Sequence, residues 1–216
     1  MRVTTPQQKY IGEVFGLNDP DLHRVRERMI AADKEFMSIS GSEARVLQFL
    51  IRGFQIEKIV EFGTLYGYSS LAMAKALPVN GQIITLEKDT KHHELAAESF
   101  KNSPVAKKIV SLCGDATELM HSIEKRGPFD MVFIDANKTG YVDYLNWAEK
   151  NVRQGGLIIG DNTFLFGAMW DETERKNLGD AQVAVMREFN IRLSDSKKYN
   201  SMLIPTAEGM TVAQKL

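Results

Sequence analysis

From residue 56 onward, short runs of apolar residues alternate with segments of helical periodicity, and this alternation constrains the fold most strongly. The apolar runs predict strands at residues 58–62, 82–87, 109–112, 131–135 and 157–160. The segments between them predict helices at residues 68–77, 91–102, 115–125 and 141–151. Strands that are apolar throughout, separated by helices, are typical of a parallel sheet covered on both faces. We therefore predict an α/β fold whose parallel strands end at one edge, where such sheets bind ligands.

The two ends of the chain differ from this middle region. Residues 1–54 show no clear strand and predict a helical N-terminal region, with helices at 22–30 and 42–51. Near the other end, residues 181–187 predict a helix, and two short strands are predicted at 191–195 and 201–205, close enough to pair antiparallel. A turn is predicted at residues 208–209. No repeat or linker is visible within the 216 residues, so we predict a single domain over residues 1–216.

The charge and the composition exclude several classes of protein. A formal net charge of -1 gives no electrostatic reason to bind nucleic acid or an anionic membrane. Neither an apolar signal segment nor a stretch of about 18 apolar residues is present, so we expect a cytoplasmic protein. The single cysteine, Cys113, fits a reducing compartment, and the apolar run before it predicts a buried strand residue rather than a nucleophile.

A glycine turn follows the first predicted strand, in the sequence Glu-Phe-Gly-Thr-Leu-Tyr-Gly-Tyr-Ser at residues 61–69. Gly63 and Gly67 allow the backbone to approach a ligand closely where the next helix begins. The third glycine of the dinucleotide-binding pattern is missing, which disfavours a nicotinamide-dependent oxidoreductase. Glu61 suits a ligand with a cationic amine, because a carboxylate would repel a pyrophosphate.

Two further acidic residues follow the next two strands. Glu87 closes the second strand, where a carboxylate can accept hydrogen bonds from both hydroxyls of a ribose. Asp115, beside Ala116, follows the third strand and can accept a hydrogen bond from an adenine amino group. Each acid alone could equally be a helix cap or a solvated loop residue. As a set with Glu61 and the glycine turn, they predict S-adenosylmethionine as the cofactor rather than NAD.

Three segments of the sequence resemble the metal-dependent O-methyltransferases, a family that includes catechol and caffeoyl-coenzyme A O-methyltransferases and many bacterial relatives. The segments are the glycine turn, Phe-Asp-Met-Val-Phe-Ile-Asp-Ala-Asn-Lys at residues 129–138, and Gly-Gly-Leu-Ile-Ile-Gly-Asp-Asn at residues 155–162. The resemblance implies a Rossmann-like fold with a seven-stranded, mostly parallel sheet that contains one antiparallel strand, and commonly a homodimer. The remaining predicted cofactor contacts are Met37, Ser69, Ala116 and Asp135.

A metal site is predicted where the fourth and fifth strands end. Asp135 ends one strand, and Asp161 and Asn162 end the other, so two carboxylates and an amide oxygen converge. This set of oxygen ligands suits Mg²⁺, Mn²⁺ or Ca²⁺ rather than zinc, and none of the four histidines lies at a strand end. An aspartate after a strand can also simply stabilise a turn. The resemblance assigns the role of general base to Lys138, a position that otherwise reads as a solvated loop lysine.

The resemblance implies an enzyme that transfers a methyl group to a hydroxyl of a small aromatic vicinal diol, such as a catechol, caffeoyl or flavonoid compound. Two adjacent substrate oxygens that chelate one metal would be positioned for reaction. The sequence departs from the family at Asn137, where many relatives have an acid, and in residues 163–170. Phe164, Phe166, Met169 and Trp170 in this loop are candidate walls of an aromatic pocket. The alternatives are a methyltransferase that uses no metal and a non-catalytic protein that binds an adenosyl ligand, and residues 1–54 could serve as a dimer contact or a substrate lid.

Overall fold

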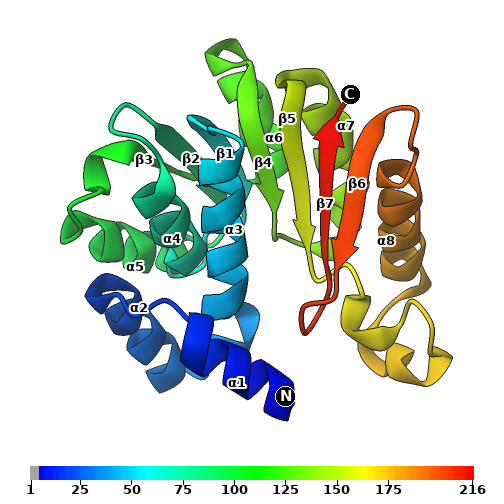
Figure 1. Ribbon diagram of the computed structural model, residues 1–216, viewed down its shortest axis with the longest axis horizontal. Helices are drawn as coiled ribbons and strands as arrows, with labels where there is room; N and C mark the ends of the chain where they lie inside the picture. Colours follow the sequence, from blue (N-terminus) through cyan, green and yellow to red (C-terminus); the bar gives the residue numbers. More distant parts are fainter. Residues whose placement is uncertain (1–4) are drawn as a thin grey trace. The chain divides into compact units, whose positions relative to one another are not determined.

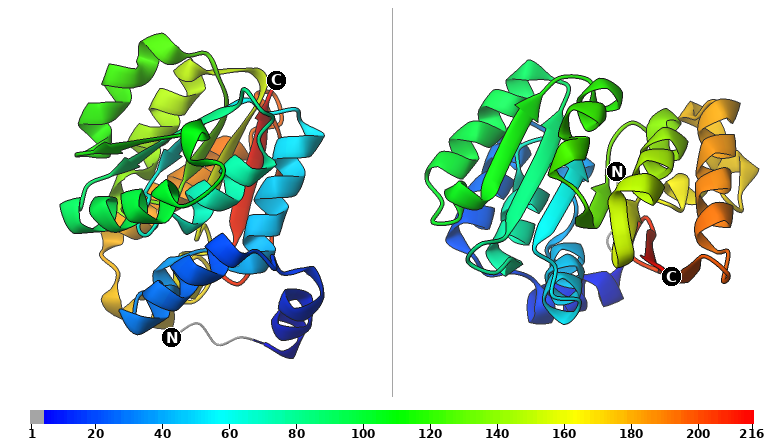
Figure 2. Two further views of the ribbon diagram at one scale, coloured as in Figure 1. Left: turned by 90° about the vertical axis from the view of Figure 1, so that its left-hand side faces the viewer. Right: turned by 90° about the horizontal axis from the view of Figure 1, so that it is seen from above.

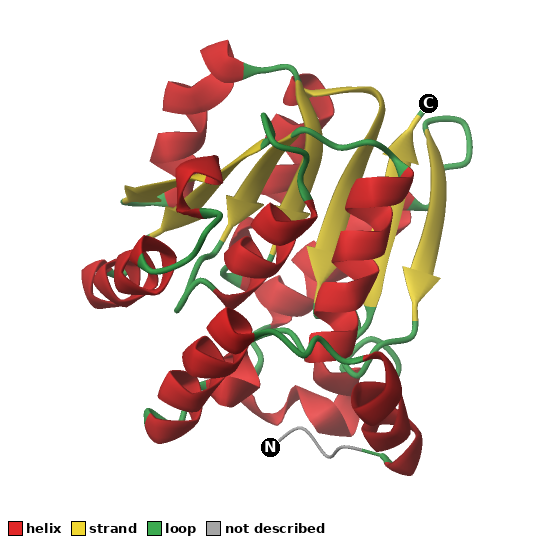
Figure 3. Cartoon of the chain, turned by 60° about the vertical axis from the view of Figure 1, so that its left-hand side comes forward, coloured by secondary structure: helices red, strands yellow, loops and turns green. Residues whose placement is uncertain are grey.

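The computed structural model describes residues 5–216, apart from the side chains of residues 175–177. Within these residues, seven strands form a sheet in the order β3-β2-β1-β4-β5-β7-β6 (Figure 1). The strands are β1 (Lys58–Phe62), β2 (Gln82–Glu87), β3 (Ile109–Cys113), β4 (Phe129–Ile134), β5 (Val152–Asp161), β6 (Tyr199–Ile204) and β7 (Met210–Lys215). The arrow of β7 runs opposite to those of its neighbours β5 and β6, whereas β4 and β5 are parallel (Figure 3). This confirms the predicted seven-stranded, mostly parallel, Rossmann-like sheet.

Eight α-helices accompany the strands in the described part of the chain, and no helix there is long and apolar enough to cross a membrane. They are α1 (Pro6–Phe15), α2 (Pro20–Ala31), α3 (Gly41–Gly53), α4 (Tyr68–Ala76), α5 (Thr90–Lys101), α6 (Ala116–Ile123), α7 (Tyr141–Asn151) and α8 (Asp180–Leu193). Short 3₁₀ turns are η1 (Glu35–Met37), η2 (Ala106–Lys108), η3 (Glu124–Arg126), η4 (Lys138–Gly140), η5 (Leu165–Gly167) and η6 (Glu172–Asn177). The helical N-terminal region is confirmed for the residues that the structure describes.

The chain separates into two compact units. Unit 1 takes the chain up to Lys58 together with Thr64–Asp115, and unit 2 takes Ile59–Gly63 together with Ala116–Leu216. In unit 2, residues 131–134 of β4 and 157–159 of β5 are fully buried, which explains why these runs are apolar at every position. Helices α7 and α8 lie side by side in the same unit (Figure 2). The predicted single domain stays a prediction.

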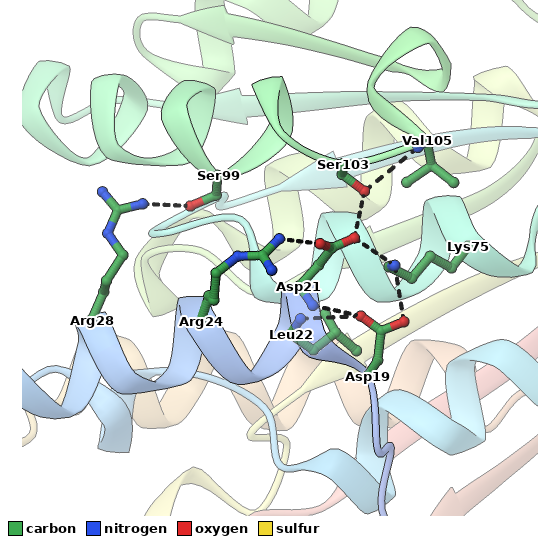
Figure 4. A network of polar contacts seen from close by, with 9 residues as sticks. All are labelled: Asp19, Asp21, Leu22, Arg24, Arg28, Lys75, Ser99, Ser103 and Val105. Atoms are coloured by element: carbon green, nitrogen blue, oxygen red, sulfur yellow. Dashed lines mark hydrogen bonds and ion pairs between the residues drawn. The ribbon is translucent and has the colours of Figure 1, made fainter.

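An ion network in unit 1 fastens α2 to α4 (Figure 4). Lys75 Nζ of α4 lies 2.7 Å from Asp21 Oδ2 and 2.9 Å from Asp19 Oδ2, and Ser103 Oγ donates to Asp21 Oδ2 at 2.9 Å. Arg24 also pairs with Asp21. Burial opposes ionisation of Asp21, but the hydrogen bonds from Lys75 and Ser103 outweigh it and hold the pKa of this carboxyl below its usual 3.8. Helix α2 is therefore an anchored part of unit 1, in contrast to α1, which has no buried residue.

Two sequence-based predictions are wrong. Residues 191–195 do not form a strand, because residues up to Leu193 continue α8, which buries Val183, Met186, Phe189 and Leu193 along one helical face. β6, which covers most of the predicted strand at 201–205, pairs antiparallel with β7 rather than with residues 191–195, and β7 is also antiparallel to β5. Cys113 is exposed at the end of β3, not buried, because the strand's last residue lies where the chain leaves the sheet.

Candidate active site

The carboxyl ends of β4 and β5 bring the predicted metal ligands into one region of unit 2. The two strands pair in parallel register, with Ile134 opposite Gly160, so the residues that follow are neighbours. Asp135 leaves β4 with its side chain 17% exposed, whereas Asp161 and Asn162 are 1% and 6% exposed. The polar groups thus lie together at the ends of two neighbouring strands and are largely shielded from water.

Lys138 reaches into this cluster from the turn η4 that follows β4. Its Nζ donates to Asn162 Oδ1 at 2.8 Å and lies 3.5 Å from Asp135 Oδ1. Its side chain is only 12% exposed, so it is not a solvated loop lysine. The structure therefore brings together the predicted base and two of the three predicted metal ligands.

Tyr141, the first residue of α7, is a member of this cluster that sequence reasoning missed. It is fully buried, and its Oη accepts a hydrogen bond from Lys138 Nζ at 2.7 Å. The same Oη lies 2.7 Å from the carbonyl oxygen of Asp161 and 3.1 Å from that of Ile134. Burial, reinforced by the charges of Asp135 and Asp161, raises the pKa of Tyr141 well above its usual range, so the phenol stays neutral. Its spacing of three residues after Lys138 is the signal that could have identified it.

The residues present fit a hard cation. In the described part of the chain, no three His, Cys, Asp or Glu side chains are grouped as a metal site. The predicted set instead combines the carboxylates of Asp135 and Asp161 with the amide oxygen of Asn162, and all three are oxygen donors of the kind that Mg²⁺ prefers. The Lys138 ammonium already rests against Asn162 Oδ1 and near Asp135 Oδ1, which shows that these oxygens hold a positive charge. Asn162 Nδ2 is buried without a hydrogen-bond partner in the described residues, so the amide is held through its oxygen.

Three other predicted cofactor residues, Glu61, Gly63 and Ala116, belong to unit 2. Gly63 follows β1 with φ +96°, and a Cβ there would overlap the carbonyl oxygen of Asp135. Its glycine identity is therefore required by the close approach of the two strand ends, whatever ligand binds. Glu61 is fully buried in β1, and Ala116 begins α6 with 9% exposure.

The cofactor residues predicted in unit 1 have protein partners of their own. Glu87 Oε2 accepts hydrogen bonds from the backbone amides of Thr64, at 3.1 Å, and Leu65, at 2.8 Å, so this carboxylate holds the glycine turn. Asp115 Oδ2 pairs with Lys88 Nζ at 2.8 Å. A Cβ on Gly67, at φ +84°, would meet the ring of Phe100. Ser69 is buried in α4 and Met37 is 44% exposed in η1.

The loop after Asn162 carries the aromatic residues that the sequence nominates as pocket walls. Phe164 packs over Gly209, where a Cβ would meet its ring, and its ring centroid lies 5.0 Å from that of Trp170. Phe166 and Trp170 are 47% and 67% exposed, whereas Met169 is half-buried. These residues therefore present apolar surface next to Asn162 in the chain, and a role in substrate binding stays a prediction.

The fold and the cluster define a Rossmann-like α/β enzyme of the class that places its reactive groups at the carboxyl ends of parallel strands. The O-methyltransferase family model matches residues 16–216, and the chain belongs to this family.

Individual relatives and solved structures agree with this assignment. The chain is 34% identical over 197 residues to a catechol O-methyltransferase of Niastella koreensis, covering 90% of this chain and 87% of the relative. The O-methyltransferase TomG from Streptomyces achromogenes, in complex with SAM, superposes with a TM-score of 0.86 at 29% identity and covers 98% of this chain and 96% of its own. An O-methyltransferase from Bacillus cereus, in complex with SAH, gives 0.87 at 28% identity and 98% coverage of both chains.

Proposed function

We propose that the chain transfers the methyl group of S-adenosylmethionine to one hydroxyl of a small aromatic vicinal diol, with Lys138 as the general base. Asp135, Asp161 and Asn162 would hold a divalent cation, with Mg²⁺ as the expected ion. The observation that carries the proposal is the position of Lys138 Nζ, shielded from water and in contact with Asn162 Oδ1 beside Asp135. The name of the Niastella koreensis relative supports a catechol as substrate, and the SAM and SAH complexes of the two solved structures support the cofactor.

Lys138, as the neutral amine, would take the proton of the reacting hydroxyl at its Nζ and become an ammonium. A general base must lie within hydrogen-bond distance of that proton, and Nζ is already held at the strand edge where ligands bind in this class of fold. The cation, when bound, would stabilise the negative oxygen that results. The reaction joins an anionic oxygen and a cationic sulfonium into neutral products, so it is favoured where water is excluded. The burial of Asp161, Asn162 and Lys138 provides this environment.

The proposed cofactor contacts are Met37, Glu61, Gly63, Gly67, Ser69, Glu87, Asp115, Ala116 and Asp135. The contacts of Glu87 sharpen one of them. A carboxylate offers about four acceptor positions. In Glu87 these already serve the amides of Thr64 and Leu65 through Oε2 and the amide of Asp89, at 2.9 Å, through Oε1. We therefore expect Glu87 to bind one ribose hydroxyl rather than both. The homodimer and the cytoplasmic location stay predictions.

The proposal is tested by measuring transfer of a labelled methyl group from S-adenosylmethionine with two isomeric substrates, catechol and resorcinol. We expect methylation of catechol, whose hydroxyls are adjacent, and little of resorcinol, whose hydroxyls are not. Excess EDTA should abolish the reaction and Mg²⁺ should restore it. Undiminished transfer in EDTA would contradict the role of the cation, and equal rates on the two isomers would contradict the vicinal diol.

Variants assign the reaction to the site. Asp135→Ala should lose the Mg²⁺-dependent activity because it removes one proposed ligand. Asp143→Ala provides the matched control, since Asp143 is an exposed aspartate on α7. If both variants kept the wild-type rate, the active site would lie elsewhere.

A further inference from the structure

We propose that Tyr141 is a positioning residue that fixes Lys138 Nζ beside Asp135 and Asn162 while joining the ends of β4 and β5. The inference rests on the proposed function of Lys138 as the base, and it adds a residue that neither the motif nor the family assignment identifies.

Tyr141 Oη stands at the junction of three groups. It accepts a hydrogen bond from Lys138 Nζ at 2.7 Å and lies 2.7 and 3.1 Å from the carbonyl oxygens of Asp161 and Ile134. A phenol has one hydrogen to donate, and a carbonyl oxygen can only accept. The hydrogen of Tyr141 therefore points to the strand ends, and a lone pair faces Lys138. Through one atom, the lysine is tied to the backbone of the two strands that carry Asp135 and Asp161.

The ring of Tyr141 gives the lysine a fixed partner. Lys138 Nζ lies 2.7 Å from Oη and 4.7 Å from the ring centroid, so it sits beside the hydroxyl end of the ring. The ring itself is fixed, because it is fully buried and packs edge-on against Phe189 of α8 at 5.2 Å between centroids. A long flexible side chain is thereby held against a rigid hydroxyl, and its Nζ is directed to Asn162 Oδ1.

A second buried tyrosine on α7 shows that this arrangement is not a general consequence of packing. Tyr144 is also buried, and its ring stacks on Phe62 at 4.6 Å. Its hydroxyl, however, donates to Asn137 Oδ1 on the exposed side of the turn. A phenylalanine could fill the space of Tyr141, but it would leave the two carbonyls and the lysine without this partner.

The test compares Tyr141→Phe with Tyr199→Phe by steady-state kinetics on catechol. Tyr199 is a buried tyrosine of β6 whose hydroxyl donates to Glu149 Oε1 at 2.8 Å, so its variant also loses one buried hydrogen bond without touching the cluster. We expect Tyr141→Phe to lower kcat about tenfold with KM unchanged, as for a pair of coupled residues. Tyr199→Phe should lower the melting temperature and leave kcat unchanged. A wild-type kcat in folded Tyr141→Phe would overturn the proposal.

A double-mutant cycle separates positioning of Lys138 from a structural effect. In a Lys138→Ala background, Tyr141→Phe should change kcat by less than about twofold, because the group that it positions has been removed. The same tenfold loss in both backgrounds would show that Tyr141 acts independently of the lysine and would overturn the proposal.

Crystal structures distinguish this proposal from the proposed function. If wild type and Lys138→Ala methylate catechol equally, Lys138 is not the base, and that part of the proposed function fails. The position of Lys138 Nζ in Tyr141→Phe then remains decisive. We expect it to leave hydrogen-bond distance of Asn162 Oδ1, and an unmoved Nζ would overturn the role of Tyr141.

Discussion

Two clusters in this chain each combine a shielded lysine with aspartates, but the two lysines differ in the groups that they contact. In unit 1, Lys75 is 17% exposed and lies 2.7 and 2.9 Å from the carboxylates of Asp21 and Asp19. In unit 2, Lys138 is 12% exposed, yet its contacts at 2.7 and 2.8 Å are to the neutral oxygens of Tyr141 and Asn162, and Asp135 is 3.5 Å away. The lysines are equally shielded, so the difference lies in their partners.

The partners decide what each lysine can do. A lysine between two carboxylates is held most strongly as a cation, which suits a structural link between two helices. Lys138 has its shortest contacts to an amide and a phenol, with Asp135 as a longer ion pair, and so it lies among the groups that the proposed reaction uses. We therefore expect substitutions in the unit 1 cluster to change stability and those in the unit 2 cluster to change activity.

The largest expected effect is that of Lys138→Ala on catalysis. Loss of a general base should lower kcat on catechol about 1,000-fold, or about 4 kcal/mol of transition-state stabilisation. The free energy of unfolding, measured with urea, should change by less than about 1 kcal/mol, because active sites are retained for activity at a cost in stability. A large loss of stability with kcat retained would show that Lys138, like Lys75, serves stability, and would contradict the expected difference between the clusters.

Gly63→Ala should disturb the backbone that carries Asp135 in the unit 2 cluster. The new methyl group would overlap the carbonyl oxygen of Asp135 at a φ of +96°, so we expect a loss of about 3 kcal/mol in unfolding free energy, with reduced activity. Gly53→Ala is the control, since no atom lies within 4 Å of a Cβ at that position, and it should stay within about 0.5 kcal/mol of wild type. Similar unfolding curves for both variants would refute the steric argument.

Lys75→Met should lower stability and leave catalysis unchanged, whereas Lys138→Ala should do the reverse. Removing this cation leaves Asp19 and Asp21 without their shared partner and should lower the unfolding free energy by about 2 kcal/mol, with kcat of the folded enzyme unchanged. Lys9→Met removes an exposed pair with Glu13 at 3.9 Å and should cost less than about 0.5 kcal/mol. Equal effects of the two substitutions would show that the network does not stabilise the fold.

The smallest expected effect is the acid sensitivity of the unit 1 cluster. Because the folded-state pKa of Asp21 lies below its usual 3.8, this carboxylate contributes stability above that pH, and the contribution is lost as pH falls through the folded-state value. Urea unfolding from neutral pH down to about pH 2 should show that the advantage of wild type over Asp21→Asn shrinks below about pH 4. A constant difference across that range would contradict the assignment.

A strand or helix could be predicted from the sequence where all its residues share one environment, such as burial on both faces of a sheet. The runs at 131–135 and 157–160 are apolar because β4 and β5 are buried on both faces, so their existence could be predicted, although β5 extends from Val152 to Asp161. Residues 191–195 were mistaken for a strand, since the apolar spacing that continues α8 becomes clear only when Val183 to Leu193 are taken together. The burial of Cys113 was also mispredicted, because a strand's last residue need not share its environment.

For the candidate site, the sequence determined which groups are available and the tertiary structure decided how they are paired. Asp135, Asp161 and Asn162 could be predicted because they stand where two predicted parallel strands end, and parallel strands end at one edge. Lys138 was predicted from the resemblance to the family. Which of them touch could not, since the contact of Lys138 with Asn162 joins residues 24 apart in the chain. The spacing of Tyr141 after Lys138 could have nominated the residue, but not its contacts with the strand ends, and the protein contact behind Gly63 left no signal. A hydroxyl or a missing Cβ acquires its role only from the backbone packed against it.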